Sequence, residues 1–288
     1  MDVLITGLLL GGTYALIAMG LNLQYGMARI MNLANGEMLV TGGFVAFWFW
    51  TGSQISPLLT VFLVAPAAFA LNWLIYVIFL GPLVKRARSR GQLEVDAILT
   101  TFGLSFVAVG LMLAFFGGDY FSYSYLSTPI QIFGDTYGAN RVAAFVSAVL
   151  ICGALLLWLA RSRAGMTIRA ISVAPDSARL VGIDVRRTAA LAFALGGAVT
   201  ATGGALISTF LTLDASTGVI FTLKALVIVI MGGVGDVRGT IVAALLLGLL
   251  ETFVARMIDP GLTLAAAYLL FVVILLFRPQ GLFGRPTT

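Results

Sequence analysis

Long apolar runs, separated by glycines and short basic clusters, constrain the fold of this chain more than any other feature. Several runs approach or exceed the roughly 18 apolar residues that are typical of a membrane span. Over its 288 residues the chain is 60% hydrophobic and only 10% charged, whereas soluble domains carry about 25% charged residues. The sequence therefore predicts an all-α polytopic integral membrane protein, with residues 1–288 forming a single transmembrane domain.

The apolar runs predict eight or nine transmembrane helices. Their expected ranges are 3–24, 37–52, 56–82, 95–117, 140–160, 188–212, 219–233, 239–257 and 261–277. The ranges 37–52 and 219–233 are short for a hydrocarbon core of about 30 Å. Either one could be a broken or re-entrant element, so both span counts remain open.

Basic residues gather in three regions, and their distribution predicts which loops face the cytoplasm. Residues 85–90 hold four basic side chains, the loop of about 161–187 holds six, and the C-terminal tail adds Arg278 and Arg285. Basic residues are enriched in cytoplasmic loops. We therefore place these regions and the C-terminus in the cytoplasm, and the N-terminus outside. The segment of about 118–139, which has aspartates and aromatics but no Lys or Arg, is predicted to be an outside loop.

The residue inventory excludes several functional classes. The chain has no histidine and one cysteine, Cys152, which lies in an apolar run and is expected to be a packing residue. This inventory provides neither a disulfide framework nor a common zinc site. The stretch MGGVGDVRG (231–239) lacks the Gly-Lys-Ser/Thr ending of a phosphate-binding loop. We therefore predict no metal, no cofactor and no nucleotide on this chain, and an integral membrane enzyme is disfavoured.

Polar residues interrupt the apolar sequence at YGMARIMNLANGEML (25–39). This stretch contains Asn32, Asn35, Gly36 and Glu37, and Arg29 is the nearest expected partner for the Glu37 carboxylate. One interpretation is a solvated turn between two spans. The other is a broken helix that lines a pathway for a polar solute, because an intramembrane carboxylate normally faces a cavity or a partner.

A second, glycine-rich stretch is weakly similar in sequence to this one. IMNLANGEMLVTGG (30–43) and IMGGVGDVRGTIVA (230–243) share an apolar start, a break and a Gly-acid pair, which indicates an internal pseudo-repeat or a chance similarity. Transporters often carry internal repeats whose broken helices meet near the bilayer midplane. The pathway candidates here are Gly232, Gly233, Gly235 and Asp236. Glu251, in an apolar helix, is either a buried functional carboxylate or a polar packing contact.

Paired glycines within AFALGGAVTATGGALIS (192–208) predict a helix that packs closely against its neighbours. Small residues allow membrane helices to approach each other without a hydrophobic driving force. A glycine hinge is the alternative interpretation.

The basic loop around 161–188 predicts a short helix. Pro175 can open it, Asp176 lies in its first turn and Gly182 can close it. The helix over 175–183 would be small, amphipathic and surrounded by arginines. It is either a docking helix for a soluble partner or part of a solvated basic loop.

At this loop the sequence resembles a known family. DSARLVG (176–182) is similar to the Glu-Ala-Ala-x-x-x-Gly coupling motif of ABC importer permeases, with Asp176 and Ser177 replacing the first two residues. The flanking loop, residues 11–26, residues 232–251 and the tail FRPQGLFGRP (277–286) resemble the branched-chain amino acid permease family, which has urea and amide relatives. The resemblance implies that the ATPase-docking residues are Pro175, Asp176, Ser177, Ala178, Gly182 and Ile183.

The resemblance also implies a set of partners and a location. We expect a second, homologous permease subunit, two cytosolic ATPases that bind ATP and Mg²⁺, and an outside solute-binding protein. The chain would lie in the bacterial cytoplasmic (inner) membrane and import a small polar solute, with no role for nucleic acid. A homodimer or a heterodimer, and a leucine-type amino acid, urea, an amide or another small acid, all remain open.

One position departs from the family pattern. Asn35 stands where the family commonly has histidine, so a charge change near neutral pH is lost there. A role of that histidine in selecting or releasing the solute would imply a different solute for this chain. The competing functional class is a stand-alone secondary transporter or channel, which would work without an ATPase and would have no use for a coupling loop.

Overall fold

The computed structural model describes residues 2–87, 89–132 and 134–284, so Arg88 and Arg285 of the basic clusters lie outside the described residues. Each predicted span corresponds to helical structure. The spans are α1 (Asp2–Asn22) with the π-helix η1 (Leu23–Met27), α2 (Asn35–Ser53), α3 (Pro57–Ile75) with η2 (Tyr76–Leu80) and α4 (Gly81–Arg86), α5 (Arg90–Phe116), α6 (Ala139–Arg161), α9 (Val185–Ile207), α10 (Thr217–Gly232), α11 (Val237–Met257) and α12 (Thr263–Phe277). The smaller elements are β1 (Pro129–Ile132), β2 (Asp135–Gly138), α7 (Arg163–Val173), α8 (Pro175–Leu180) and the 3₁₀ turn η3 (Pro260–Leu262).

The helices confirm an all-α, multi-pass membrane protein. Within the described residues, seven helical stretches are long and apolar enough to cross a membrane. They contain α1, α3, α5, α6, α9, α11 and α12. The two segments predicted to be short, α2 and α10, complete the set of nine, and α10 has only 16 residues. Both of these helices begin inside the helix bundle, as described below.

Helix α9 is the centre of the bundle, and its paired glycines explain why. A Cβ atom on Gly196 would collide with the carbonyl of Gly20 in α1, and one on Gly204 would collide with the carbonyl of Leu39 in α2. Gly197 lies equally close to the Asn72 side chain of α3. These contacts confirm the predicted packing role, because backbones can come this close only where a side chain is missing.

The outer helices have apolar side chains on their outward faces. Examples are Leu99 and Phe106 on α5 and Leu269 and Leu276 on α12, all of them largely exposed. Their exposure would be unfavourable in water but suits contact with lipid tails, which are themselves apolar. Cys152 is buried in α6, as a packing residue should be.

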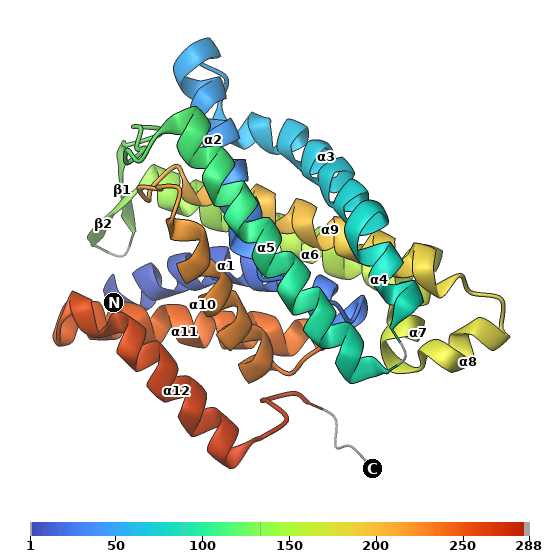
Figure 1. The fold of residues 1–288 in the computed structure, drawn as a ribbon. Coiled ribbons are helices and arrows are strands. Elements are labelled where there is room, and N and C mark those ends of the chain that lie inside the picture. The colour runs from blue at the N-terminus through green and yellow to red at the C-terminus, as the bar shows by residue number, and fades with distance from the viewer. Residues whose placement is uncertain (1, 88, 133, 285–288) are drawn as a thin grey trace.

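The bundle has two distinct ends (Figure 1). The antiparallel β1–β2 hairpin and the N-terminus lie at one end, and α7 and α8 lie at the opposite end. We call these the hairpin end and the loop end. The segment 118–139, which was predicted to be an outside loop, contains this small hairpin. The hairpin-end loops are held together by the Phe121–Leu213 bridge and by a 2.6 Å hydrogen bond between Ser56 Oγ and Tyr125 Oη.

Candidate functional site

The polar stretch 25–39 is a real interruption of the helical structure. Helix α1 ends in the π-helical turn η1, and regular structure resumes only at Asn35. Between them, the Asn32 side chain donates to Gln24 Oε1 at 2.9 Å and accepts the Ala34 N–H at 3.0 Å. Thr101 on α5 accepts the Leu33 N–H at 3.1 Å. Side chains therefore satisfy the backbone of this segment, which we call the polar break (residues 28–34), as a buried irregular segment requires.

The polar break ends where two helices begin inside the bundle. The Gly36 N–H in the first turn of α2 donates to Thr222 Oγ1 at 2.7 Å, near the start of α10. A Cβ atom on Gly36 would collide with the Gly218 carbonyl, so only glycine allows this approach. Helix N-termini carry partial positive charge and exposed N–H groups. The starts of α2 and α10 therefore bring this partial positive charge to one place.

Asn35 and Glu37 lie on different faces of α2. Residues two positions apart in a helix point about 200° away from each other. The contacts agree with this geometry. Asn35 Oδ1 accepts from Thr200 of α9 at 2.9 Å, while the Glu37 carboxylate packs on Gly218 of α10. Both side chains are fully buried. Among the described residues, Asn35 Nδ2 and both oxygens of Glu37 have no hydrogen-bond partner. Buried polar groups without a partner are rare in folded proteins, and an intramembrane carboxylate in this state is a candidate functional group.

The expected pairing of Glu37 with Arg29 is wrong. Arg29 turns away from the bundle core and donates through Nη2 to the Ser172 carbonyl at 2.7 Å. The solvated-turn interpretation is also wrong, because Asn32, Asn35 and Glu37 are buried. These residues are buried because the break between η1 and α2 is short. Helix α2 therefore starts inside the bundle rather than at its end.

The second glycine-rich stretch forms the tight turn between α10 and α11. Gly233 and Gly235 have φ values of +105° and +87°, which are strained for any residue with a side chain. The Asp236 carboxylate accepts the Gly239 N–H at 2.8 Å and caps α11. This capping bond gives Asp236 a structural role. The Gly235 N–H donates to Asn22 Oδ1 at 2.8 Å, which ties the turn to the end of α1.

The two interruptions predicted from the sequence lie against each other. A Cβ atom on Gly26 of η1 would collide with the backbone of Gly235. The C-terminal tail closes the other side, where the Leu282 N–H donates to the Met231 carbonyl at 2.7 Å and the Phe283 N–H to the Gly232 carbonyl at 3.2 Å. Stretches at opposite ends of the sequence thus form one glycine-rich junction.

Glu251 has partners that the sequence did not suggest. Its Oε2 accepts from Lys224 Nζ of α10 and from Tyr14 Oη of α1, each at 2.8 Å. Lys224 also donates to Tyr14 at 2.8 Å. This triad connects three helices, so the packing interpretation of Glu251 has the stronger support. Lys224 was the available signal, because an isolated lysine in an apolar helix normally has a carboxylate partner.

The basic loop contains two helices where one was predicted. Helix α7 was missed, although Ser162 provides an N-cap signal and accepts the Gly165 N–H at 2.9 Å. Helix α8 starts at Pro175 with Asp176 in its first turn, as predicted, but it ends at Leu180 rather than at 183. Gly182, with φ +81°, then redirects the chain, and the Ile183 N–H returns to the Ala178 carbonyl.

The side chains of α8 divide into an inward and an outward set. Ala178 is buried, whereas Asp176 and Ser177 are exposed. Leu180 and Val181 are 88% and 76% exposed at the loop end. Large apolar side chains exposed beside arginines are typical of a protein-binding surface. Sequence reasoning had singled out the motif residues and missed these two.

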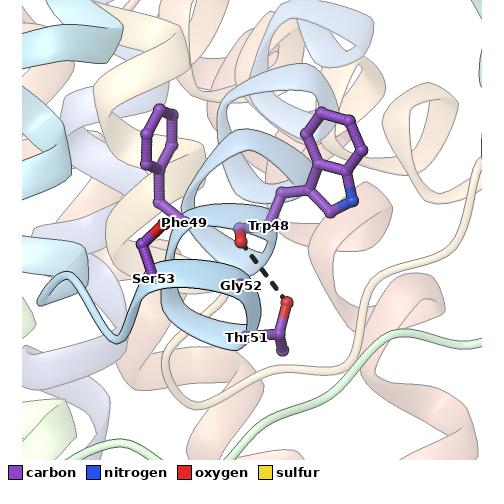
Figure 2. A pocket seen from close by; sticks show the side chains of 5 residues that line it. All are labelled: Trp48, Phe49, Thr51, Gly52 and Ser53. Atoms are coloured by element: carbon purple, nitrogen blue, oxygen red, sulfur yellow. Dashed lines mark hydrogen bonds between the residues drawn. The ribbon is translucent and has the colours of Figure 1, made fainter.

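Two hollows lie at opposite ends of the bundle. Figure 2 shows one of about 450 Å³ on the tip of α2, where Trp48 and Phe49 point away from each other and Thr51 bonds to the Trp48 carbonyl. It has no charged lining residue and is an open surface feature. The other, of about 270 Å³, is polar and lies where the break, α5, α7 and the α10–α11 turn meet; it is lined by Tyr25, Gly26, Arg29, Glu94, Ser172 and Val234.

Comparisons with known proteins cover nearly the whole chain. Residues 3–278 match the family model described as branched-chain amino acid transport system / permease component. The high-affinity branched-chain amino acid transport system permease protein BraD of Pseudomonas aeruginosa is 29% identical, covering 98% of this chain and 95% of that protein. The corresponding permease protein LivH of Escherichia coli K12 is 25% identical, covering 97% and 94%.

A more distant similarity extends to other import permeases. The autoinducer 2 import system permease protein LsrC of Klebsiella pneumoniae is 30% identical, but over only 60% of this chain and 49% of that protein. No solved structure matches the chain.

Proposed function

The chain belongs to the family of branched-chain amino acid transport system permease components, and we propose that it carries a branched-chain amino acid across the bacterial inner membrane. It is the membrane permease of an ABC importer and not an enzyme. The solute is proposed because the relatives that cover nearly all of the chain bear that solute in their names. Urea, short amides and other small acids are the competing solutes.

The exposed apolar surface of α8 carries the proposal for the partners. A soluble ATPase pair would cover Leu180 and Val181, which water would otherwise surround. ATP and Mg²⁺ would bind to those ATPases, because this chain has no phosphate-binding loop. Ala178 packs inward beneath the surface, so a push on α8 would reach the body of the bundle. The loop end and the C-terminus would then face the cytoplasm.

The proposed path runs past the meeting point of α2 and α10. Asn32, Asn35, Gly36 and Glu37 border it, and the N-terminal N–H groups of both helices could receive the carboxylate of an amino acid. Asn35 and Glu37 are fully buried, so the path would open only when the helices move apart. A second, homologous permease would form the other wall, and an outside binding protein would deliver the solute to the hairpin end.

Purification of the transporter from its host tests this proposal. We expect a stoichiometric P-loop ATPase to co-purify with the wild-type chain in mild detergent and to be lost from the double variant Leu180→Asp/Val181→Asp. Both positions are exposed, so the change should leave the fold intact. Met257→Asp/Ile258→Asp is the matched control, because it puts the same two charges on neighbouring exposed apolar residues at the end of α11, far from the loop. A chain that purifies without any ATPase would contradict the proposal.

A further inference from the structure

Arg29 connects the loop helices to the polar break through an unusual local geometry. It lies between η1 and α2 with φ +59°, a left-handed conformation that residues with a side chain seldom adopt. From there its guanidinium donates to the Ser172 carbonyl at 2.7 Å and, more weakly, to the Val173 carbonyl at 3.4 Å. These residues are 143 and 144 positions away in the sequence.

The carbonyls that Arg29 contacts are at the C-terminus of α7. The last carbonyls of a helix have no partner within it, and positive charge is favoured there. Ala174 alone separates α7 from α8, which starts at Pro175. Arg29 therefore holds the joint between α7 and the helix proposed to dock the ATPase.

On its other side, Arg29 leads directly into a tightly bonded segment. The Ile30 N–H donates to the Gln24 carbonyl at 3.0 Å, and the contacts of Asn32, Leu33 and Gly36 follow within seven residues. These bonds, which reach Gln24 of η1, Thr101 of α5 and Thr222 of α10, leave the segment little freedom to absorb a displacement by bending. A displacement of Arg29 would therefore reach the first turn of α2, where Glu37 lies.

The surroundings of Arg29 also leave room for such movement. The polar hollow of about 270 Å³ is lined by Arg29, Ser172, Gly26 and Val234 among others. Closely packed interfaces resist sliding, whereas a hollow beside a polar link allows the two parts to shift together.

We propose that Arg29 is a positioning residue that transmits movement of the α7–α8 loop to the polar break. This inference rests on the proposed function, because it assumes that an ATPase moves the loop. The proposed link lies outside the coupling motif. It consists of the Arg29 side chain, which comes from the polar break and bonds to the end of α7.

Hydrogen exchange of the purified transporter complex, before and after trapping with ATP and vanadate, tests the link without any assumption about the solute. In the wild type we expect trapping to change exchange in α7–α8 and also in residues 28–36. In Arg29→Ala the change in α7–α8 should remain and the change in 28–36 should be lost. Arg29→Lys should give a partial response, because lysine keeps the charge but lacks the planar fork.

Arg169→Ala is the matched control, since Arg169 is an exposed arginine of α7 that donates to the Ala160 carbonyl at 3.2 Å. It should respond like the wild type. Unchanged slow exchange in the buried helix α9 would show that each variant is folded. With a solute identified by uptake, the amount imported per ATP hydrolysed should fall about fivefold or more in Arg29→Ala.

Two results would overturn the inference, and they are distinguishable. If residues 28–36 of Arg29→Ala respond to trapping as in the wild type, Arg29 is not the link and the proposed function stands. If no ATPase is present in the wild-type complex, the proposed function fails first and the link fails with it.

Discussion

At the scale of single residues, two groups of buried polar side chains in this chain can be compared. Lys224, Tyr14 and Glu251 bond to one another through Glu251 Oε2 and connect three helices, while Glu251 Oε1 has no partner among the described residues. Glu37 and the amide nitrogen of Asn35 have no partner among the described residues. A satisfied group holds the fold together, whereas an unsatisfied one is tolerated where function needs it. Stability effects should therefore come mainly from the first set, and transport effects from the second.

The Lys224–Glu251 pair allows a quantitative test of this division. Glu251→Leu leaves a charged lysine that is only 15% exposed, and removing one partner of a buried pair costs about 3–5 kcal/mol. The double variant Lys224→Met/Glu251→Leu removes both charges, so it should lose less free energy of unfolding than Glu251→Leu alone. Denaturant unfolding of the purified chain in detergent measures both. A double variant that loses as much free energy of unfolding as Glu251→Leu alone, or more, would contradict the coupling of the pair.

The sequence predicted which residues are polar and buried better than it predicted their partners. Glu251 could be found as a carboxylate in an apolar run, but its contact with Tyr14 depends on how α1 and α11 pack. Arg29 and Glu37 are eight residues apart and looked like a pair. The break places them on opposite sides of a turn, which no local pattern reveals.

At the scale of elements, close approach to α9 depends on glycine at particular positions. We expect Gly204→Ala to destabilise the protein by about 1–3 kcal/mol, because the added methyl meets the Leu39 backbone and forces the helices apart. Gly153→Ala on α6 is the control, since nothing lies within 4 Å of the methyl group that alanine would add there. Thermal unfolding in detergent should show a lower Tm for the first variant alone. Equal shifts would contradict the packing role of Gly204.

The start of α10 is stabilised by hydrogen bonds to the Asp214 carboxylate, and this stabilisation depends on pH. Partial burial raises the pKa of Asp214, but hydrogen bonds from Thr217 and Ser216 outweigh it and hold the pKa below its ordinary value. A lowered pKa stabilises the fold above the ordinary pKa of about 3.9, and this stability is lost as pH falls through the folded value.

Asp214→Asn should therefore lower Tm slightly at pH 7. The difference from the wild type should shrink as pH falls below about 4, where the unfolded-state carboxyl becomes protonated. Thermal unfolding of both proteins between neutral and acidic pH measures it. A difference that grows on acidification would show that the hydrogen bonds do not favour the charged carboxylate.

The sequence predicted helices correctly where local signals determine them and long-range contacts do not. Apolar length located the spans, and Pro175 and Gly182 located α8. The β1–β2 hairpin is short and depends on pairing across a turn, and its four-residue strands carry little periodicity. Helix α7 was missed because its arginines were assigned to the loop as a whole, although Ser162 marked its start.

At the scale of the whole molecule, the surface that we propose for docking lies at one end, and the Arg29 bond to α7 links its loop to the polar break inside the bundle. If the predicted spans number nine and alternate in direction, the two termini lie on opposite sides of the membrane. The N-terminus lies at the hairpin end, and the tail packs on the α10–α11 turn. The family membership came from motifs spread over nearly the entire chain, and no single site would have established it.

The most direct measurement is leucine uptake by liposomes that contain this chain, its co-purified subunits and the binding protein. We predict uptake of labelled leucine only when ATP is supplied on the side of the ATPases, with isoleucine and valine competing and urea without effect. Uptake by the chain alone, driven by an ion gradient and independent of ATP, would contradict the importer mechanism.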